Sequence, residues 1–173
     1  LFGLVGNLTD SLPDWYSASV WMDQTLKSAV PNWSQVEQGI GNGAGVLVQR
    51  ILANQLHTMT IDARLDEALK HFMVAYQQLG NKQSRLYDGV EGLLGELHQS
   101  GVRQGVITNK PSRFTKPLLS QFGILHYFDL VYSGDSFAEK KPHPMPLLKA
   151  TQQMGFAVDE CLMVGDSSND INA

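Results

Sequence analysis

The chain has 173 residues, 43% of them hydrophobic and 17% charged, and this composition excludes a disordered or fibrous protein. The net charge of −4, without a basic run, excludes a protein that binds the backbone of a nucleic acid. Cys161 is the only cysteine, which excludes an internal disulfide and a cysteine-rich metal site and favours a buried thiol within a strand.

The length predicts one core with at most an insert. No apolar run approaches the roughly 18 residues that span a bilayer, and no signal peptide precedes the first predicted strand. We therefore expect a cytoplasmic protein without a membrane partner.

The first predicted element is a short strand that leads into a loop. An apolar start, Leu1 to Val5, runs into Gly6 and then into a turn rich in hydroxyl groups. Such a loop is typical of a catalytic site, yet the first nine residues contain no carboxylate, Cys, His or Lys. Asp10 and Ser11 come later and are expected to cap the next helix.

The second region, residues 13–84, shows helical patterns only. Apolar side chains recur at helical spacing in two places: Trp15, Tyr16, Val20 and Leu26, and then Leu65, Leu69, Phe72, Met73 and Tyr76. We interpret the region as a helical insert after the first strand. An insert there is expected to lie over the carboxyl ends of the strands, where open parallel sheets bind ligands.

The insert contains a glycine-rich segment, GIGNGAG, at residues 39–45. It formally matches a dinucleotide-binding fingerprint, but the preceding SQVEQ favours a helix end over the strand that this fingerprint requires. A turn between two helices, with backbone amides toward a ligand, is the preferred interpretation.

The remaining chain repeats one unit: a helical pattern, a turn, and a short apolar run that ends in polar residues. Strands are predicted within VRQGVITNK, FDLVYSGD and ECLMVGDSSND. Helices are predicted before the first of these strands and at residues 112–122 and 144–154, with Ser112 as a helix cap. Alternating strands and helices predict an α/β protein with a parallel sheet and right-handed crossovers.

Polar side chains follow each of these predicted strands. They suit a phosphate and a divalent cation: Thr108 and Asn109, then Lys140 and Lys141, then Asp166 and Asp170. Each group alone has an ordinary alternative, since the first suits a turn, the second a solvated loop, and Asp170 a helix cap.

Taken in order, the segments resemble the haloacid dehalogenase-like hydrolases, and in detail their phosphoglycolate phosphatase branch. The resemblance rests on GNLTDSLPD, GNGA, YDGVEGLLGEL, VITNKPSRFTKPLL, FDLVYSGDSFAEKKPHPMPLL and LMVGDSSNDINA. It implies a Rossmann-like parallel sheet core, residues 1–12 and 85–173, with a helical cap, residues 13–84, inserted after the first strand. It also implies that the family's core continues beyond Ala173 and is truncated here.

The resemblance assigns roles to matching positions. Thr108 and Asn109 look like the residues that bind the transferring phosphoryl group, and Lys141 looks like the lysine that neutralises it. Asp166 resembles the carboxylate that holds Mg²⁺, together with the backbone carbonyl at Val5. Asp170 resembles either a second direct ligand or a residue that supports the ligands from behind. Asn42 and Gly43 are similar to the cap loop that closes over the substrate.

The first motif departs from the family pattern. Alignment through Gly6 places Gly3 at the nucleophilic aspartate, Val5 at the general acid/base aspartate, and Asn7 at a threonine. In the family a carboxylate attacks phosphorus and forms an aspartyl-phosphate. Glycine offers no nucleophile, and valine cannot protonate the leaving group, a role typically worth about 10²- to 10⁴-fold in rate.

Two hypotheses follow. The resemblance predicts an Mg²⁺-dependent phosphatase that acts on a small phosphorylated metabolite such as 2-phosphoglycolate, with this chain impaired or inactive as written. The alternative is a catalytically silent protein that still binds a phosphate ligand.

Overall fold

The computed structural model describes residues 1–55 and 61–173, and the chain divides into two compact units. Unit 1 contains Leu1–Asp10 and Arg85–Ala173, and unit 2 contains Ser11–Ser84. The predicted insert, residues 13–84, includes residues 56–60, which lie outside the described part. That unit 2 acts as a cap stays a prediction.

Unit 1 is built on four chain segments that run parallel. Strands β3 (Gly105–Ile107) and β4 (Leu130–Tyr132) pair in parallel, with Val106 opposite Val131. Phe2 forms parallel bridges to Val106 on one side and to Val164 on the other. The start of the chain therefore lies between β3 and the segment around Val164, which confirms the predicted α/β class with parallel pairing.

The first and last of these segments are shorter than predicted. The chain start and the CLMV segment carry only isolated bridges, although the Gly3 N–H donates to the Val164 carbonyl at 2.9 Å. Leu162 is 74% exposed and Val164 40%, so this segment lacks the burial that stabilises a central strand. The prediction of a buried strand thiol was wrong, because Cys161 is only half-buried and directly follows the short helix η2 (Val158–Glu160).

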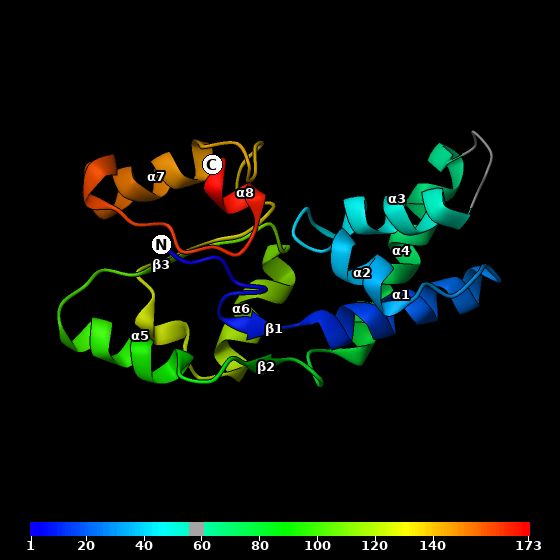
Figure 1. Ribbon diagram of the computed structural model, residues 1–173, viewed down its shortest axis with the longest axis horizontal. Coiled ribbons are helices and arrows are strands. Elements are labelled where there is room, and N and C mark those ends of the chain that lie inside the picture. Colours follow the sequence, from blue (N-terminus) through cyan, green and yellow to red (C-terminus); the bar gives the residue numbers. More distant parts are fainter. Residues whose placement is uncertain (56–60) are drawn as a thin grey trace. The chain divides into compact units, whose positions relative to one another are not determined.

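Helices cover both faces of the parallel segments (Figure 1). Val106 belongs to a cluster with residues of α5 (Val90–Gln99) and α6 (Ser112–Gln121), whereas Ile107 packs with α7 (Met145–Met154). Neighbouring residues of β3 thus point to opposite faces, as strand geometry requires.

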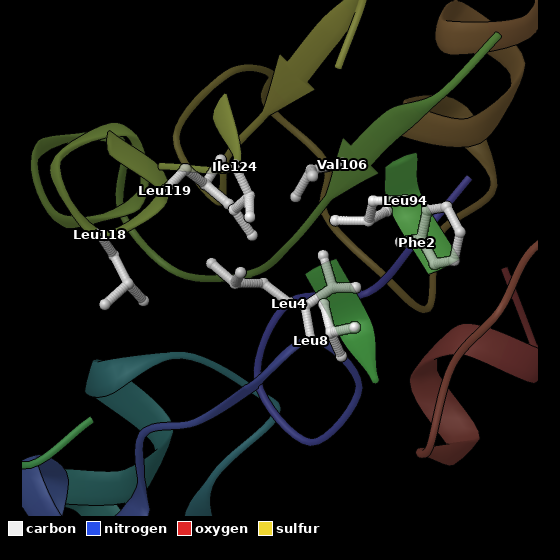
Figure 2. Packing of buried hydrophobic residues seen from close by; sticks show 9 residues of the cluster. Phe2, Leu4, Leu8, Leu94, Val106, Leu118, Leu119 and Ile124 are labelled. Atoms are coloured by element: carbon white, nitrogen blue, oxygen red, sulfur yellow. The ribbon is translucent and has the colours of Figure 1, made fainter. Parts of the chain in front are cut away.

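The larger of the two clusters forms the main core (Figure 2). Leu4, Leu94, Leu118, Leu119 and Ile124 are each at most 1% exposed. Full burial of such a side chain stabilises a fold by roughly 1.5–3 kcal/mol. The short helix η1 (Leu125–Tyr127) adds Leu125 and Tyr127 at the edge of this cluster.

The predicted cap of α6 was wrong. Pro111 is the N-cap, and Ser112 is the first helical residue. The backbone N–H and the hydroxyl of Ser112 donate to Asp135, at 2.9 and 2.8 Å. A carboxylate from the loop after β4 therefore satisfies the helix start that the serine was expected to cap.

The predicted helix cap at Asp10 and Ser11 was correct for the position of Ser11 and wrong for Asp10. Asp10 ends β1 (Thr9–Asp10), which pairs antiparallel with β2 (Arg85–Leu86), and its carboxylate lies 3.3 Å from the Arg85 guanidinium. Ser11 is the N-cap residue of α1 (Leu12–Leu26) but makes no capping hydrogen bond through its side chain.

Unit 2 contains α1, α2 (Trp33–Gly39), α3 (Ala44–Gln55) and α4 (Ile61–Leu79). Trp15 of α1 packs on Phe72 and Tyr76 of α4, with ring centroids 5.6 and 5.5 Å apart. Residues 40–43 form the turn between α2 and α3. A helix therefore precedes the glycine-rich segment, which contradicts the dinucleotide fingerprint and confirms the helix-to-helix turn.

A buried carboxylate joins the two ends of unit 2. Asp14 of α1 is 1% exposed, and it accepts hydrogen bonds from the backbone N–H groups of Gln83 and Ser84, at 3.1 and 2.6 Å. The Ser84 hydroxyl donates to the same carboxylate at 2.5 Å. These bonds compensate the burial of the charge. Within the described part of the chain, no helix is long and apolar enough to cross a membrane.

Candidate functional site

The predicted site residues of unit 1 lie in loops that leave the parallel segments at one edge. The loops follow Gly3, Ile107, Tyr132 and Val164, and all four segments run in the same direction. Carboxyl ends of parallel strands share one edge of a sheet, where α/β proteins bind ligands. The positions of the side chains in these loops decide what the edge can bind.

Lys141 is at the centre of the contacts between these loops. Its ammonium donates to the backbone carbonyl of Ile107 at 2.6 Å and to Oδ1 of Asp170. Lys141 and Asp170 are each only 6% exposed. A buried charge is costly unless it is paired and hydrogen-bonded, so the lysine and the aspartate depend on each other.

Asp170 has a second set of partners at the start of α8 (Ser168–Ile171). Its Oδ2 accepts from the backbone N–H and the hydroxyl of Ser167, at 3.1 and 2.5 Å. Burial alone would raise the pKa of the Asp170 carboxyl, but the hydrogen bonds from Lys141 and Ser167 outweigh burial and hold the pKa below its usual value. The aspartate thus both caps the helix and neutralises the lysine.

Thr108 and Asn109 follow β3 directly and are both buried. The side-chain amide of Asn109 donates to the Lys141 carbonyl at 2.8 Å, and Thr108 Oγ1 accepts from the Lys110 N–H at 3.1 Å. A Cβ on Gly134 would overlap the Asn109 carbonyl oxygen, so the loops after β3 and β4 pack backbone against backbone. The Lys141 loop is therefore held in place by the loop that carries Thr108.

The loop at the chain start packs against Asp166. The Asn7 amide Nδ2 donates to Asp166 Oδ1 at 2.8 Å. Gly6 has a φ of +85°, and a Cβ there would overlap Asp166 Oδ2. Glycine is required at this position both by the backbone conformation and by the close carboxylate.

Gly3 lies beside the same group of side chains. A Cβ at Gly3 would lie 2.5 Å from Asn7 Nδ2 and 3.4 Å from Asp170 Oδ1. A side chain at residue 3 would therefore begin beside the Asn7 amide and close to Asp170, the partner of Lys141. The Asn7 amide now fills part of that space.

The structure brings Gly3, Lys141, Asp166 and Asp170 into one group, connected through Asn7 and Asp170. Val5 is two residues farther on, where it bridges Thr9 and packs against the main core cluster. Asn42 and Gly43 lie in unit 2, in the turn between α2 and α3. The roles expected for these residues stay predictions.

Two participants were not predicted. The amide of Asn7 was noted only as a replacement for threonine, and its contact with Asp166 spans 159 positions of the chain. The Ile107 carbonyl was not predicted, because every residue has a backbone carbonyl and the side-chain types do not indicate which one accepts a hydrogen bond. One signal in the sequence could have indicated the role of Asn7. Directly after Gly6 it places an amide with two N–H donors where the resemblance places a threonine.

The family resemblance implies Mg²⁺, and the donors at this edge can be compared with what that ion needs. Mg²⁺ takes oxygen ligands in near-octahedral geometry, commonly one or two carboxylates with water and substrate phosphate. Asp170 already accepts from Lys141 and Ser167, and Asp166 from Asn7. Among residues 1–55 and 61–173, no three His, Cys, Asp or Glu side chains gather as a metal cluster. Asp170 is thus taken up by Lys141 and Ser167, which leaves the exposed Asp166 as the expected carboxylate that could meet an ion, a poor donor set for Mg²⁺.

Comparison with known proteins gives a consistent result. The family model described as haloacid dehalogenase-like hydrolase matches residues 7–173, so the match begins at Asn7. A phosphoglycolate phosphatase from Nitrosococcus oceani is 38% identical over 173 residues, covering 100% of this chain and 77% of that protein. Another, from Colwellia psychrerythraea, is 41% identical over 178 residues, with the same two coverages.

A solved structure agrees in fold. The crystal structure of a predicted phosphoglycolate phosphatase from Haemophilus somnus 129pt matches with a TM-score of 0.90 and 33% sequence identity. The match covers 99% of this chain and 77% of that one. The similarity thus extends over nearly all of this chain.

Proposed function

Because the chain belongs to the haloacid dehalogenase-like hydrolases, we propose that its site binds the phosphoryl group of a small metabolite such as 2-phosphoglycolate. The observation that carries this proposal is the buried ammonium of Lys141, surrounded by the loops that follow the parallel segments. The names of the relatives support the choice of substrate.

Lys141 is the group that attracts the phosphoryl oxygens. An ammonium has three N–H donors, and two of them go to Ile107 and Asp170. We assign the third to the ligand. The low dielectric of a buried position strengthens this interaction compared with a lysine in water. Thr108 and Asn109 are assigned to the same phosphoryl group, and Asn42 and Gly43 to the organic part of the substrate.

Hydrolysis requires groups that this chain lacks. At the nucleophile position, Gly3 has no side chain, and at the acid/base position Val5 packs into the core. We propose that the ligand is bound and that phosphoryl transfer is impaired or absent. Haloacid dehalogenase-like phosphatases generally use Mg²⁺, and by resemblance Asp166, Asp170 and the Val5 carbonyl correspond to its donors, although in this chain Lys141 and Ser167 already engage Asp170. A cytoplasmic location stays a prediction.

Restoring the first motif tests the family activity. Since a Cβ at residue 3 would lie 2.5 Å from the Asn7 amide, the restored variant combines Gly3→Asp and Val5→Asp with Asn7→Thr. We expect this variant, assayed with Mg²⁺, to release inorganic phosphate from 2-phosphoglycolate and the parent chain to release none above the buffer. The matched control carries Gly3→Asn in place of Gly3→Asp, which keeps the size but removes the nucleophile.

Two results would contradict the proposal. A restored variant that folds but releases no phosphate would refute the family activity for this site. A parent chain that turns over as fast as the restored variant would refute the impairment. Titration calorimetry of the parent chain with 2-phosphoglycolate addresses the alternative, a silent binding protein, because that function needs heat of binding without turnover.

A further inference from the structure

We propose that Asn7 makes ligand binding at this site independent of a divalent cation: phosphoryl oxygens are held by amide and ammonium N–H groups alone. The inference rests on the proposed function, since it concerns the same phosphoryl ligand. It identifies Asn7 as the residue that decides whether ligand binding requires a divalent cation.

The first observation is that the Asn7 amide occupies the place where a side chain at residue 3 would begin, so such a side chain would require the amide to move. The amide nitrogen lies 2.5 Å from where a Cβ on Gly3 would be, well inside the contact distance of two such atoms. The position of the Asn7 amide in this chain therefore depends on the glycine at residue 3.

The second observation is what the amide does there. It donates to Asp166 Oδ1 at 2.8 Å, while Asp166 Oδ2 lies against the backbone of Gly6. Asp166 is exposed, so solvent and the Asn7 amide can both serve its carboxylate, and one of its oxygens is bound by a donor from the protein. Asn7 has a second N–H on the same nitrogen, and we assign it to a ligand oxygen.

The third argument is electrostatic. Asp166, Asp170 and Lys141 together carry a formal charge of −1, and aspartates at positions 3 and 5 would make it −3. A divalent cation would return that more acidic site to −1. The site of this chain already has a charge of −1 without any cation. It therefore repels an anionic ligand no more than the more acidic site would with its cation bound.

Titration calorimetry tests the proposal on the whole chain. 2-Phosphoglycolate and, separately, inorganic phosphate are titrated in a buffer with EDTA and in a buffer with Mg²⁺. We expect dissociation constants that agree within about twofold between the two buffers, since no cation contributes to binding.

The variant Asn7→Thr tests the assigned residue. It removes the amide donor from Asp166, so we expect binding in EDTA to weaken by about 10-fold and to recover in part with Mg²⁺. Asn7→Asp, which replaces the donor by a further carboxylate, is expected to depend on Mg²⁺ more strongly. Asn172→Thr, at an exposed asparagine of the same unit, is the control and should bind as the parent does. Circular dichroism confirms that each variant is folded.

The outcomes separate this inference from the function it rests on. Binding that appears only with Mg²⁺ would overturn the inference and leave the proposed function intact. Binding in neither buffer would overturn the proposed function and the inference with it. Equal binding of Asn7→Thr and the parent in EDTA would refute the role of Asn7.

Discussion

Four loops lie at the same edge of unit 1, namely the loop at the chain start and the loops after β3, β4 and Val164. They differ in which of the expected functional groups they contain. The later loops keep a buried lysine, its aspartate and the amide that holds the lysine's backbone. The first loop has glycine and valine where the resemblance places carboxylates. The groups to which the resemblance assigns positioning and reaction thus come from separate segments of the chain.

The difference has a physical basis. Lys141, Asp170, Asn109 and Ile107 are buried and hydrogen-bonded to one another, so removing one leaves another unsatisfied. Gly3 contributes no side chain to such bonds, and the Asn7 amide lies where its Cβ would be. We expect substitutions of these buried, hydrogen-bonded residues to affect stability more than substitutions in the first loop.

The largest effect is expected for Lys141→Ala. It leaves the Asp170 carboxylate buried without its cation, and breaking such a pair typically costs about 3–5 kcal/mol. We expect the free energy of unfolding, from urea titration followed by circular dichroism, to fall by an amount in this range.

Lys149→Ala on the exposed side of α7 is the control and should change little. If Lys141→Ala is too unstable to measure, Lys141→Met combined with Asp170→Asn removes both charges and should recover part of the loss. An unchanged midpoint of urea unfolding for Lys141→Ala would show that the contacts of the Lys141 ammonium do not stabilise this edge of unit 1.

Gly6→Ala addresses the first loop, with an intermediate effect. A left-handed φ costs an L-residue roughly 1–2 kcal/mol, and the new methyl group would also displace the Asp166 carboxylate. Gly89→Ala is the matched control, because its φ of +84° is nearly that of Gly6 but nothing lies within 4 Å of its Cβ position.

The difference between these two alanine variants isolates the contact with Asp166. We expect Gly6→Ala to lose at least about 1 kcal/mol more than Gly89→Ala in the same urea titration. Equal losses would mean that the close approach of Asp166 to the first loop contributes nothing to stability.

Much of this arrangement could be predicted from the sequence. Thr108, Lys141 and Asp166 each follow a predicted strand, and parallel strands end at a common edge, so their shared location follows from pattern and topology. Two of the helices of unit 2, α1 and α4, were predicted from apolar spacing because their buried faces repeat with the helical period.

What the sequence did not predict depends on contacts between distant segments. Asp135 takes over the helix start assigned to Ser112, and Asp10 pairs with Arg85 instead of capping a helix. The Asn7 amide meets Asp166 only after the chain has folded. Local patterns describe what a residue is able to do, whereas tertiary packing decides which of several partners it takes.

The smallest effect is expected for Asp135→Ala, in a later loop where the carboxylate is exposed. Hydrogen bonds from Ser112 outweigh the effect of burial and hold the pKa of the Asp135 carboxyl below its usual value. A lowered native pKa stabilises the fold above the unfolded pKa of about 3.9, and this stabilisation is lost as the pH falls through the native pKa.

The parent chain should therefore exceed Asp135→Ala in unfolding free energy by about 0.5 kcal/mol at pH 7, with a smaller difference at pH 3. Thermal unfolding across this pH range measures the difference, with Glu139→Ala, an exposed carboxylate of the same loop, as control. If the difference in unfolding free energy between the parent chain and Asp135→Ala stays constant with pH, the charge of Asp135 does not stabilise the start of α6. Packing and neutral hydrogen bonds would then hold the loops after β3 and β4 together. Among the contacts described for these loops, the ion pair of Lys141 and Asp170 would remain as the electrostatic contribution to stability.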